Sequence, residues 1–447
     1  MAALLNFTKN DFLGSVIYVD TEQIIIAIEN GIIMDKICVG NIVAIDTLRQ
    51  HELLIALIDK VTRKDIGNHY GEEDDEDEMM VSSADYVKVS IIGTYHSVYG
   101  SIHDIFKRGV ETFPQIESNC YCVSGQNLQS FMNILGKDID EEKRLKIGSF
   151  MMDTGADAVL DGNKFFQRHA AILGSTGSGK SWCVANILEK ASRLQYTNII
   201  VFDMHGEYQS LTEGSDPIAQ RYRIAGPGDL DSPKSDALFL PYWLLNREEL
   251  LSMILDRSDS NAPNQASRFT LHIRELKEQT LQKESRTDTL KTFTVDSPIP
   301  FEMNDLLARL KADDTRKGVG AGGKPVKGDW EGKLTRFIAR LETKLDDKTY
   351  GFMFQPLNNA KTYTWLGEVI CKLLGYQTGQ KGIKIIDFSE VPSDVLPVVT
   401  GTMARLLYDV QFWMKSEKRT PFTLICDEAH LYLPIKEDAD SDVPPQS

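Results

Sequence analysis

The sequence lacks any long apolar run. The best candidate, residues 237–245, contains Pro241, whereas a membrane-spanning helix needs about 20 consecutive apolar residues. The first residues, MAALLNFTKNDFLG, also lack the basic leader and apolar block that are typical of a secretory signal. These two absences predict a cytoplasmic protein that has no membrane partner.

The sequence has few cysteines and fewer basic than acidic residues. The six cysteines are scattered, with no CxxC pair and no Cys/His spacing suited to zinc, and we interpret them as the reduced thiols of a cytosolic protein. The 49 basic residues face 65 acidic residues, which gives a net charge of −16. An acidic chain is a poor candidate for coating nucleic acid with its whole surface. Any contact with DNA would therefore come from a local basic patch, such as the lining of a pore.

The first 150 residues are rich in short β-branched runs. Of the 447 residues, 42% are hydrophobic and 26% are charged, which is ordinary for a soluble globular protein of roughly three domains. In residues 1–150 the runs are separated by Gly, Asn and Asp, which predicts a small antiparallel β-barrel for assembly or docking. The runs begin at Gly14, Gln23, Gly40, Leu53 and Tyr86. Residues 72–78 are all acidic, and they form either a solvated loop, a docking segment for a basic partner or a decoy for nucleic acid.

Residues 151–211 have the pattern of an α/β unit. A short apolar strand is expected over residues 168–173, followed by a glycine-rich loop and a helix that ends near Arg193. A second strand is expected over residues 198–203. Strand, loop, helix and strand in this order imply a parallel sheet.

The same pattern returns in residues 381–447, after a mainly helical stretch over residues 212–380. Strands are expected over residues 382–387 and 422–428, with a helix over residues 395–415 between them. We therefore interpret the helical stretch as an insertion within one α/β domain.

Residues 317–328, KGVGAGGKPVKG, are too rich in glycine for a packed element. One interpretation is a surface loop without a further role. The other is a flexible basic loop in which Lys317, Lys324 and Lys327 contact DNA phosphates inside a pore.

Residues 174–181, GSTGSGKS, match the phosphate-binding pattern GxxxxGK[ST] in full. Glycines let backbone N–H groups surround phosphate oxygens, and the helix that follows adds the positive end of its dipole. Lys180 is suited to hold the β- and γ-phosphates, and the Ser181 hydroxyl is suited to ligate Mg²⁺. The expected cofactors are therefore ATP and Mg²⁺. The expected nucleotide-binding residues are Gly174, Ser175, Thr176, Gly177, Ser178, Gly179, Lys180 and Ser181.

Acidic residues follow two of the expected strands. Asp427 is placed to hold Mg²⁺, and Glu428 is placed to orient or deprotonate an attacking water. The segment DMHGEY, residues 203–208, lies at the strand end where open α/β sheets bind ligands. Glu207 or His205 could reach the nucleotide, water or a neighbouring subunit; the alternative is that this segment is simply a turn.

These motifs together resemble the HerA family, the hexameric ring ATPases of the FtsK–HerA group, which translocate along DNA. The likeness rests on Arg168-His, GSTGSGKS, DMHGEY and the DEAH that begins at Asp427. The region from Pro241 resembles the start of the family's inserted helical part, and the N-terminus resembles its HAS-barrel. The resemblance implies a RecA-like P-loop NTPase core and a role for Arg168 at the nucleotide. The expected catalytic residues are Lys180, Glu428, Arg168 and Glu207, with Ser181 and Asp427 as the metal ligands.

The family also uses an arginine finger that the next subunit donates. It normally follows the acidic strand after a further helix and strand. Because the given chain ends at Ser447, we expect the finger, the sensor strand and the C-terminal brace to have no counterpart in it.

Three classes of function remain open on this sequence. The favoured one is an ATP-driven DNA translocase or helicase, a homohexamer that works with a nuclease or a sirtuin-like effector in DNA end processing or phage defence. The second is an ATP-dependent ring scaffold that activates an effector without processive translocation. The third, a conjugation or secretion ATPase, is disfavoured by the lack of an N-terminal membrane segment. The superfamily-2 DEAH helicases are also disfavoured, because their tandem domains do not fit one core split by an insertion.

Overall fold

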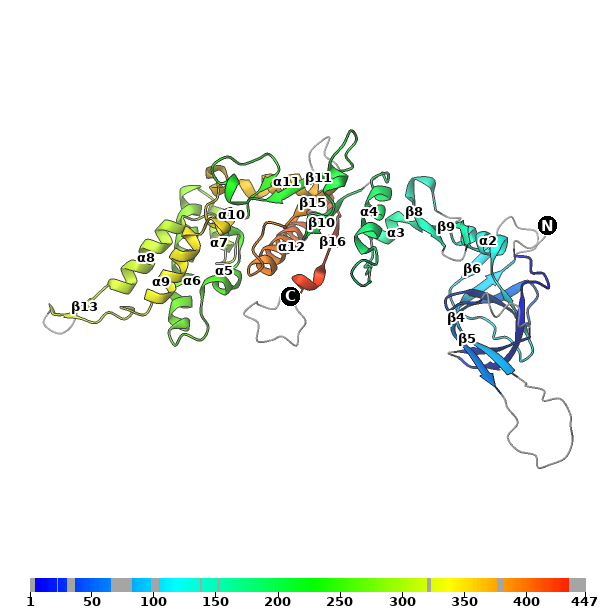
Figure 1. Cartoon of the computed structure of the whole chain (residues 1–447). Coiled ribbons are helices and arrows are strands. Elements are labelled where there is room, and N and C mark those ends of the chain that lie inside the picture. Colours follow the sequence, from blue (N-terminus) through cyan, green and yellow to red (C-terminus); the bar gives the residue numbers. More distant parts are fainter. Residues whose placement is uncertain are drawn as a thin grey trace, which may run out of the picture. The chain divides into compact units, whose positions relative to one another are not determined.

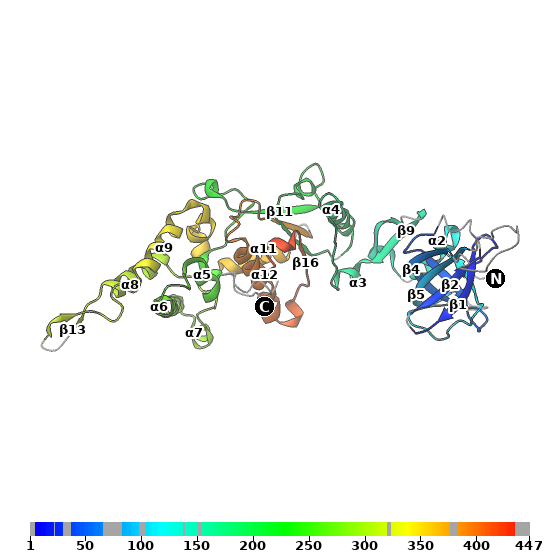
Figure 2. The same ribbon diagram turned by 60° about the horizontal axis from the view of Figure 1, so that its bottom comes forward.

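Two units of the chain, residues 1–170 and residues 171–447, have separate cores in the computed structural model (Figures 1 and 2). The structure describes residues 5–21, 23–29, 37–65, 83–97, 104–136, 139–150, 153–195, 197–319, 323–375 and 382–433. The acidic run over residues 72–78 lies outside the described residues.

Six antiparallel strands close the barrel of the first unit. They follow one another in the order β2-β1-β7-β3-β4-β5, and β5 pairs with β2 to close the ring, which leaves no free edge within it. The strands are β1 (Phe12–Val19), β2 (Ile24–Ile28), β3 (Ile42–Asp46), β4 (Glu52–Asp65), β5 (Ser83–His96) and β7 (Asn119–Cys122). Branched side chains such as Val16, Ile26 and Val89 fill the interior. The predicted N-terminal barrel is therefore confirmed.

Further elements complete the first unit. β6 (Ile105–Lys107) pairs with β5, and α2 (Gly125–Gly136) buries Leu128 and Phe131 in a cluster with Tyr95. β8 (Arg144–Phe150) and β9 (Asp153–Asp161) then form a hairpin that leads into α3 (Gly162–Phe166). The unit extends to residue 170, whereas we expected a boundary at residue 150.

A parallel sheet forms the centre of the second unit. Its strand order is β12-β11-β15-β10-β16, and every pairing is parallel. The strands are β10 (Ile199–Asp203), β11 (Ala219–Ile224), β12 (Ala237–Leu238), β15 (Ile383–Asp387) and β16 (Thr423–Cys426). All residues of β10 and β15 are buried, as expected for the middle of a sheet covered on both faces. The α/β fold class is thus confirmed.

Two features of this sheet differ from the sequence expectation. The strand expected over residues 168–173 is absent, because this segment pairs with neither β12 nor β16, and its backbone groups have no ladder to join. Leu173 is 90% exposed as a result. In addition, β11 and β12 lie within residues 212–380, the stretch that we expected to be mainly helical, and they extend the sheet.

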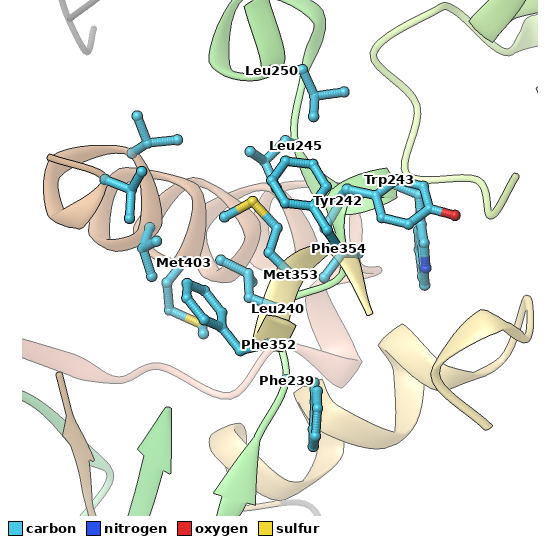
Figure 3. Close-up of a cluster of buried hydrophobic side chains, with 14 of the residues drawn as sticks. Phe239, Leu240, Tyr242, Trp243, Leu245, Leu250, Phe352, Met353, Phe354 and Met403 are labelled. Carbon is cyan, nitrogen blue, oxygen red and sulfur yellow. The ribbon is translucent and has the colours of Figure 1, made fainter. Parts of the chain in front are cut away.

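Helices make up most of the rest of the second unit, and one hydrophobic cluster joins many of them to the sheet. They are α4 (Lys180–Ala191), α5 (Arg247–Ile254), α6 (Ala262–Lys283), α7 (Thr287–Thr292), α8 (Met303–Thr315), α9 (Thr335–Asp346), α10 (Gly351–Phe354), α11 (Trp365–Leu374) and α12 (Leu396–Trp413). The segment from Phe239 to Leu245 runs through this cluster (Figure 3). The Trp243 indole N–H donates to Ala360 O at 3.0 Å, so its one polar group is satisfied.

Arg223 and Asp229 form a buried, bidentate ion pair in this unit. Two guanidinium nitrogens donate to the carboxylate at 2.7 and 2.9 Å, and they lower the pKa of Asp229 to about 2. We expect Arg223→Ala to lower the free energy of unfolding by about 3 kcal/mol, because it leaves the buried Asp229 carboxylate without a counter-charge and with only backbone N–H donors such as Gly226. Arg257→Ala is the matched control, since Arg257 pairs with Glu248 at the surface, where such a pair contributes little.

The stability that this pair provides also depends on pH in a defined direction. Because the pKa of Asp229 is lower in the folded chain than the ordinary value of 3.8, the contribution is complete above about pH 4 and disappears as the pH falls through about 2. Urea unfolding of the parent and Arg223→Ala should therefore differ less at about pH 3 than at pH 7. A difference that stays constant over this range would contradict the assignment.

In the part of the chain that the structure describes, no helix is long and apolar enough to cross a bilayer.

Candidate functional site

Glycine shapes the loop over residues 174–181. The backbone φ angles of Gly177 and Gly179 are +78° and +92°, a region that glycine adopts readily and that is costly for residues with a Cβ. At Gly174 an added Cβ would lie 2.2 Å from the Ser178 Oγ. The local geometry therefore accounts for glycine at positions 177 and 179, whereas at position 174 a rotation of the Ser178 hydroxyl would relieve the contact.

Lys180 and Ser181 form the start of α4. Gly179 is the N-cap, and the Cys183 N–H donates to its carbonyl at 2.9 Å. The Lys180 ammonium folds back over the loop and donates to Ser175 O at 3.3 Å. The first N–H groups of a helix have no partner inside it, and with the helix dipole they favour an anion. The loop, which is exposed from Gly174 to Ser178, can thus surround a phosphate group.

Asp427 follows β16 directly and is buried at the carboxyl edge of the sheet. Its N–H donates to Phe202 O at 3.2 Å, and its own carbonyl accepts from the Tyr432 hydroxyl at 3.0 Å. Burial raises the pKa of the Asp427 carboxyl, and the negative charges of Glu207 and Glu428 raise it further. Within the described residues, Asp427 Oδ2 is buried without a hydrogen-bond partner. A bound metal ion, or a closer approach of the neighbouring Tyr208 hydroxyl, would supply the missing partner.

Glu428 adopts a left-handed backbone conformation, with φ of 45° and ψ of 43°. Residues other than glycine rarely take this conformation, and such strain clusters at functional sites. The carboxylate Oε2 of Glu428 lies 3.2 Å from His430 Nδ1. The strained turn therefore places an imidazole beside the Glu428 carboxylate.

The segment over residues 203–208 is a tight turn that the Asp203 carboxylate holds together. Asp203 is 1% exposed, and it accepts the backbone N–H groups of His205, Glu207 and Tyr208 at 3.3, 3.1 and 3.1 Å. Burial raises the pKa of Asp203, while these three donors oppose the rise. The turn brings Glu207 and Tyr208 to the edge of the sheet where Asp427 lies.

Tyr208 is a residue of this edge that the sequence analysis did not single out. Its hydroxyl lies beside the Asp427 carboxylate, and Tyr208 OH and Asp427 Oδ2 are both buried without another partner among the described residues. His430, beside Glu428, was missed in the same way. Tyr208 belongs to the DMHGEY segment and His430 to DEAH. Treating each motif as a whole would therefore have included both residues among the candidates.

Other predicted site residues are not joined by an interaction in the described part of the chain. Among the described residues, no hydrogen bond or ion pair joins the loop over residues 174–181 to Asp427 or Glu428, and their joint action stays a prediction. Arg168 belongs to the first unit, where its N–H donates to Phe165 O at 3.2 Å. Its role at a nucleotide is likewise still a prediction.

Comparison with known proteins shows which family has this combination of features. Residues 145–407 match the family described as "Helicase HerA, central domain". The chain belongs to the HerA family. It is 25% identical over 346 residues to the "Probable helicase MJ1565" of Methanocaldococcus jannaschii, covering 75% of this chain and 56% of that protein.

Two further matches of this HerA-family chain are shorter or weaker. It is 40% identical over 68 residues to the "DNA double-strand break repair helicase HerA" of Saccharolobus solfataricus, covering 15% of this chain and 13% of that one. The match therefore spans about half of the first relative and a small part of the second. A solved structure of VirB4 from Thermoanaerobacter pseudethanolicus covers 66% of this chain and 70% of that chain, at 11% identity and a TM-score of 0.37, which is too distant to carry an argument.

The glycine-rich basic segment of the HerA-family chain includes a small hairpin. β13 (Gly318–Val319) pairs with β14 (Pro325–Val326), and Figures 1 and 2 show this hairpin projecting beyond α8 and α9. Lys317, Lys324 and Lys327 are exposed along it. In the described ranges no ion pair neutralises these three lysines, which leaves their charge available to a partner.

Proposed function

We propose that this chain is the nucleotide-binding part of an ATP-driven DNA motor that acts as a ring. The observation that carries the proposal is the phosphate-binding loop over residues 174–181 ahead of α4, in the same unit as a buried Asp427 and a strained Glu428. Family membership supports the same conclusion. The first test is ATP hydrolysis by the purified chain in the presence and absence of DNA.

The residues of the loop and of the sheet edge have complementary tasks in this proposal. Loop N–H groups and Lys180 hold the β- and γ-phosphates. Ser181 Oγ and the orphaned Asp427 Oδ2 are hard oxygen ligands of the kind that Mg²⁺ prefers, so the residues present fit this ion. Bound Mg²⁺ would neutralise charge on the phosphates. The Tyr432 hydroxyl, which donates to the Asp427 carbonyl, keeps the Asp427 segment in place.

Glu428 orients the attacking water and accepts its proton. Its strained conformation and its contact with His430 fix the direction of the carboxylate before any substrate binds. Glu207, held by the Asp203 turn, lies at the same edge and completes the acidic environment. Arg168 would act on the nucleotide, as the family resemblance implies.

The proposed DNA contact is local and electrostatic. With a net charge of −16, the chain as a whole repels DNA, so attraction must come from a restricted basic element. The hairpin over residues 317–327 is suited to this because its three lysines are exposed and project from the unit.

Replacing Lys317, Lys324 and Lys327 together with Ala should weaken DNA binding without sequence preference. The slope of log Kd against log salt should flatten by up to about 2.7, since each duplex phosphate contact contributes about 0.9. Fluorescence anisotropy with a labelled duplex over a salt series measures the slope. The control variant has Ala at Lys283, Lys291 and Lys348, which are also exposed, and it has the same change in charge. If the slope flattened equally in both variants, the hairpin would have no specific role in DNA binding.

The assembly that we propose is a homohexamer working with an effector, a nuclease or a sirtuin-like NAD hydrolase, in DNA end processing or phage defence. The name of the Saccharolobus relative, a double-strand break repair helicase, supports the first of these settings. Light scattering with ATP and Mg²⁺ tests the ring, and co-purification from the native cells identifies the effector. ATPase activity that DNA does not stimulate would instead favour a scaffold that activates its effector without translocation.

A further inference from the structure

Three side chains that can bind a cation converge in the first unit, in the barrel. Glu52 is the first residue of β4 and His96 is the last residue of β5, and the two are direct partners across the strands. Glu111 approaches them from the segment that follows β6. One ligand atom from each residue lies within 4.8 Å of the other two.

The imidazole lies between the two carboxylates without bonding to either. His96 Nδ1 is 3.7 Å from Glu52 Oε2, and His96 Nε2 is 3.9 Å from Glu111 Oε1. Both separations exceed a hydrogen bond. A protonated His96 that bridged the two carboxylates would lie within hydrogen-bond distance of both. The three side chains therefore do not form a complete ion-pair network by themselves.

Two polar atoms of the cluster are buried and have no hydrogen-bond partner among the described residues. They are Glu52 Oε1 and His96 Nε2, and the Glu52 side chain is only 3% exposed. Such orphaned buried atoms are rare and call for a ligand, an ion or a water. Each of them can donate a lone pair, the imidazole nitrogen when His96 is neutral.

The surface cations around the cluster do not satisfy these atoms. Arg49 Nη1 lies 3.6 Å from Glu52 Oε2 and 3.6 Å from Glu111 Oε2, and Lys107 Nζ lies 3.2 Å from Glu111 Oε1. The side chains of Arg49 and Lys107 are 60% and 55% exposed, so both can move into solvent. Neither reaches Glu52 Oε1 or His96 Nε2.

We propose that Glu52, His96 and Glu111 bind a divalent first-row transition-metal ion, with Mn²⁺ as the fitting probe. Two carboxylates and one imidazole are a donor set that suits such ions. Metal–ligand bonds of about 2.1 Å bring neighbouring ligands to about 3 Å. The Glu111 side chain, 42% exposed, therefore leaves Lys107 and moves inward to close the site. The ion then links the β4–β5 strand ends to the segment after β6, a structural role separate from nucleotide chemistry.

Mn²⁺ titration of the full chain without nucleotide tests the site. Electron paramagnetic resonance counts the bound ions, because free Mn²⁺ alone gives the sharp six-line signal. We expect Glu52→Gln and Glu111→Gln each to weaken one binding event by about 100-fold or more, since even outer partners of a metal ligand contribute 10–100-fold. Glu117→Gln, an exposed barrel glutamate, is the matched control and should leave Mn²⁺ affinity unchanged.

A second variant distinguishes a metal site from an ion-pair network by the sign of its effect. Lys107→Gln removes a positive charge that repels the metal, so Mn²⁺ should bind more tightly than to the parent. A network without a metal predicts that whatever Mn²⁺ binding occurs, including that at Ser181 and Asp427, is the same in all of these proteins. Binding that is equal in the parent, Glu111→Gln and Glu117→Gln would overturn the proposal, and Glu111→Gln keeps this test valid even if the buried Glu52→Gln variant fails to fold.

Discussion

Lys180→Ala should abolish ATP hydrolysis and weaken nucleotide binding. The ammonium is the one positive side chain of the loop, and it already folds over the loop to donate to Ser175 O. Without this ammonium, the γ-phosphate oxygens lose a positive charge that stabilises them as negative charge develops during phosphoryl transfer. The backbone N–H groups of the loop remain as hydrogen-bond donors. Hydrolysis is measured by phosphate release, and binding by the fluorescence of a labelled ATP.

The control for this change is Lys190→Ala, a lysine in the last turn of the same helix. It makes the same substitution in the same helix but away from the loop, so hydrolysis should be retained. Circular dichroism establishes that both variants are folded. Parent-level turnover in a folded Lys180→Ala protein would show that the nucleotide lies elsewhere in the chain.

The elements that the sequence predicts correctly are those with a strong local signal. The β-branched runs from Gly14 to Gly93 become barrel strands because short, branched segments between turn residues suit little else. The helix over residues 395–415 appears as α12, Leu396–Trp413. The glycines of the loop were recognisable from spacing alone, and the structure supplies the reason in the positive φ angles of Gly177 and Gly179.

What the sequence misses depends on partners that are distant along the chain. Residues 168–173 have a strand-like composition, yet a strand forms only where a neighbour offers a ladder, and this segment joins none in the described sheet. β11 contains Arg221 and Arg223, and two charged residues in a six-residue segment do not indicate a buried strand. Both arginines find acidic partners, Asp387 and Asp229, only after folding.

In the candidate site, too, some features can be predicted from the local sequence and others depend on distant partners. Asp427 and Glu428 are predictable because they end an apolar strand after a complete phosphate-binding loop. The approach of Tyr208 to Asp427 is not, since it requires β10 and β16 to be neighbours in the sheet. The strain at Glu428 also has no sequence signature, because glutamate is not a residue that favours positive φ.

Glu428→Gln should slow ATP hydrolysis by about 10²–10⁴ and leave ATP binding intact, the range expected when a general base is lost. Glutamine keeps the size of the side chain and its place beside His430, but it cannot accept a proton from water. Single-turnover hydrolysis and labelled-ATP binding separate the two effects. Glu417→Gln, an exposed glutamate ahead of β16, serves as the control and should behave like the parent.

A companion variant tests whether the strain at Glu428 serves catalysis. Glu428→Gly removes both the carboxylate and the Cβ that makes the left-handed conformation costly, by about 1–2 kcal/mol. It should therefore be as inactive as Glu428→Gln but more resistant to urea than the parent, which is expected where a strained residue is kept for function. If Glu428→Gln lost binding and turnover together, Glu428 would instead hold the edge of the sheet in place. The proton would then have to go to another base, and Glu207 is a candidate on this edge.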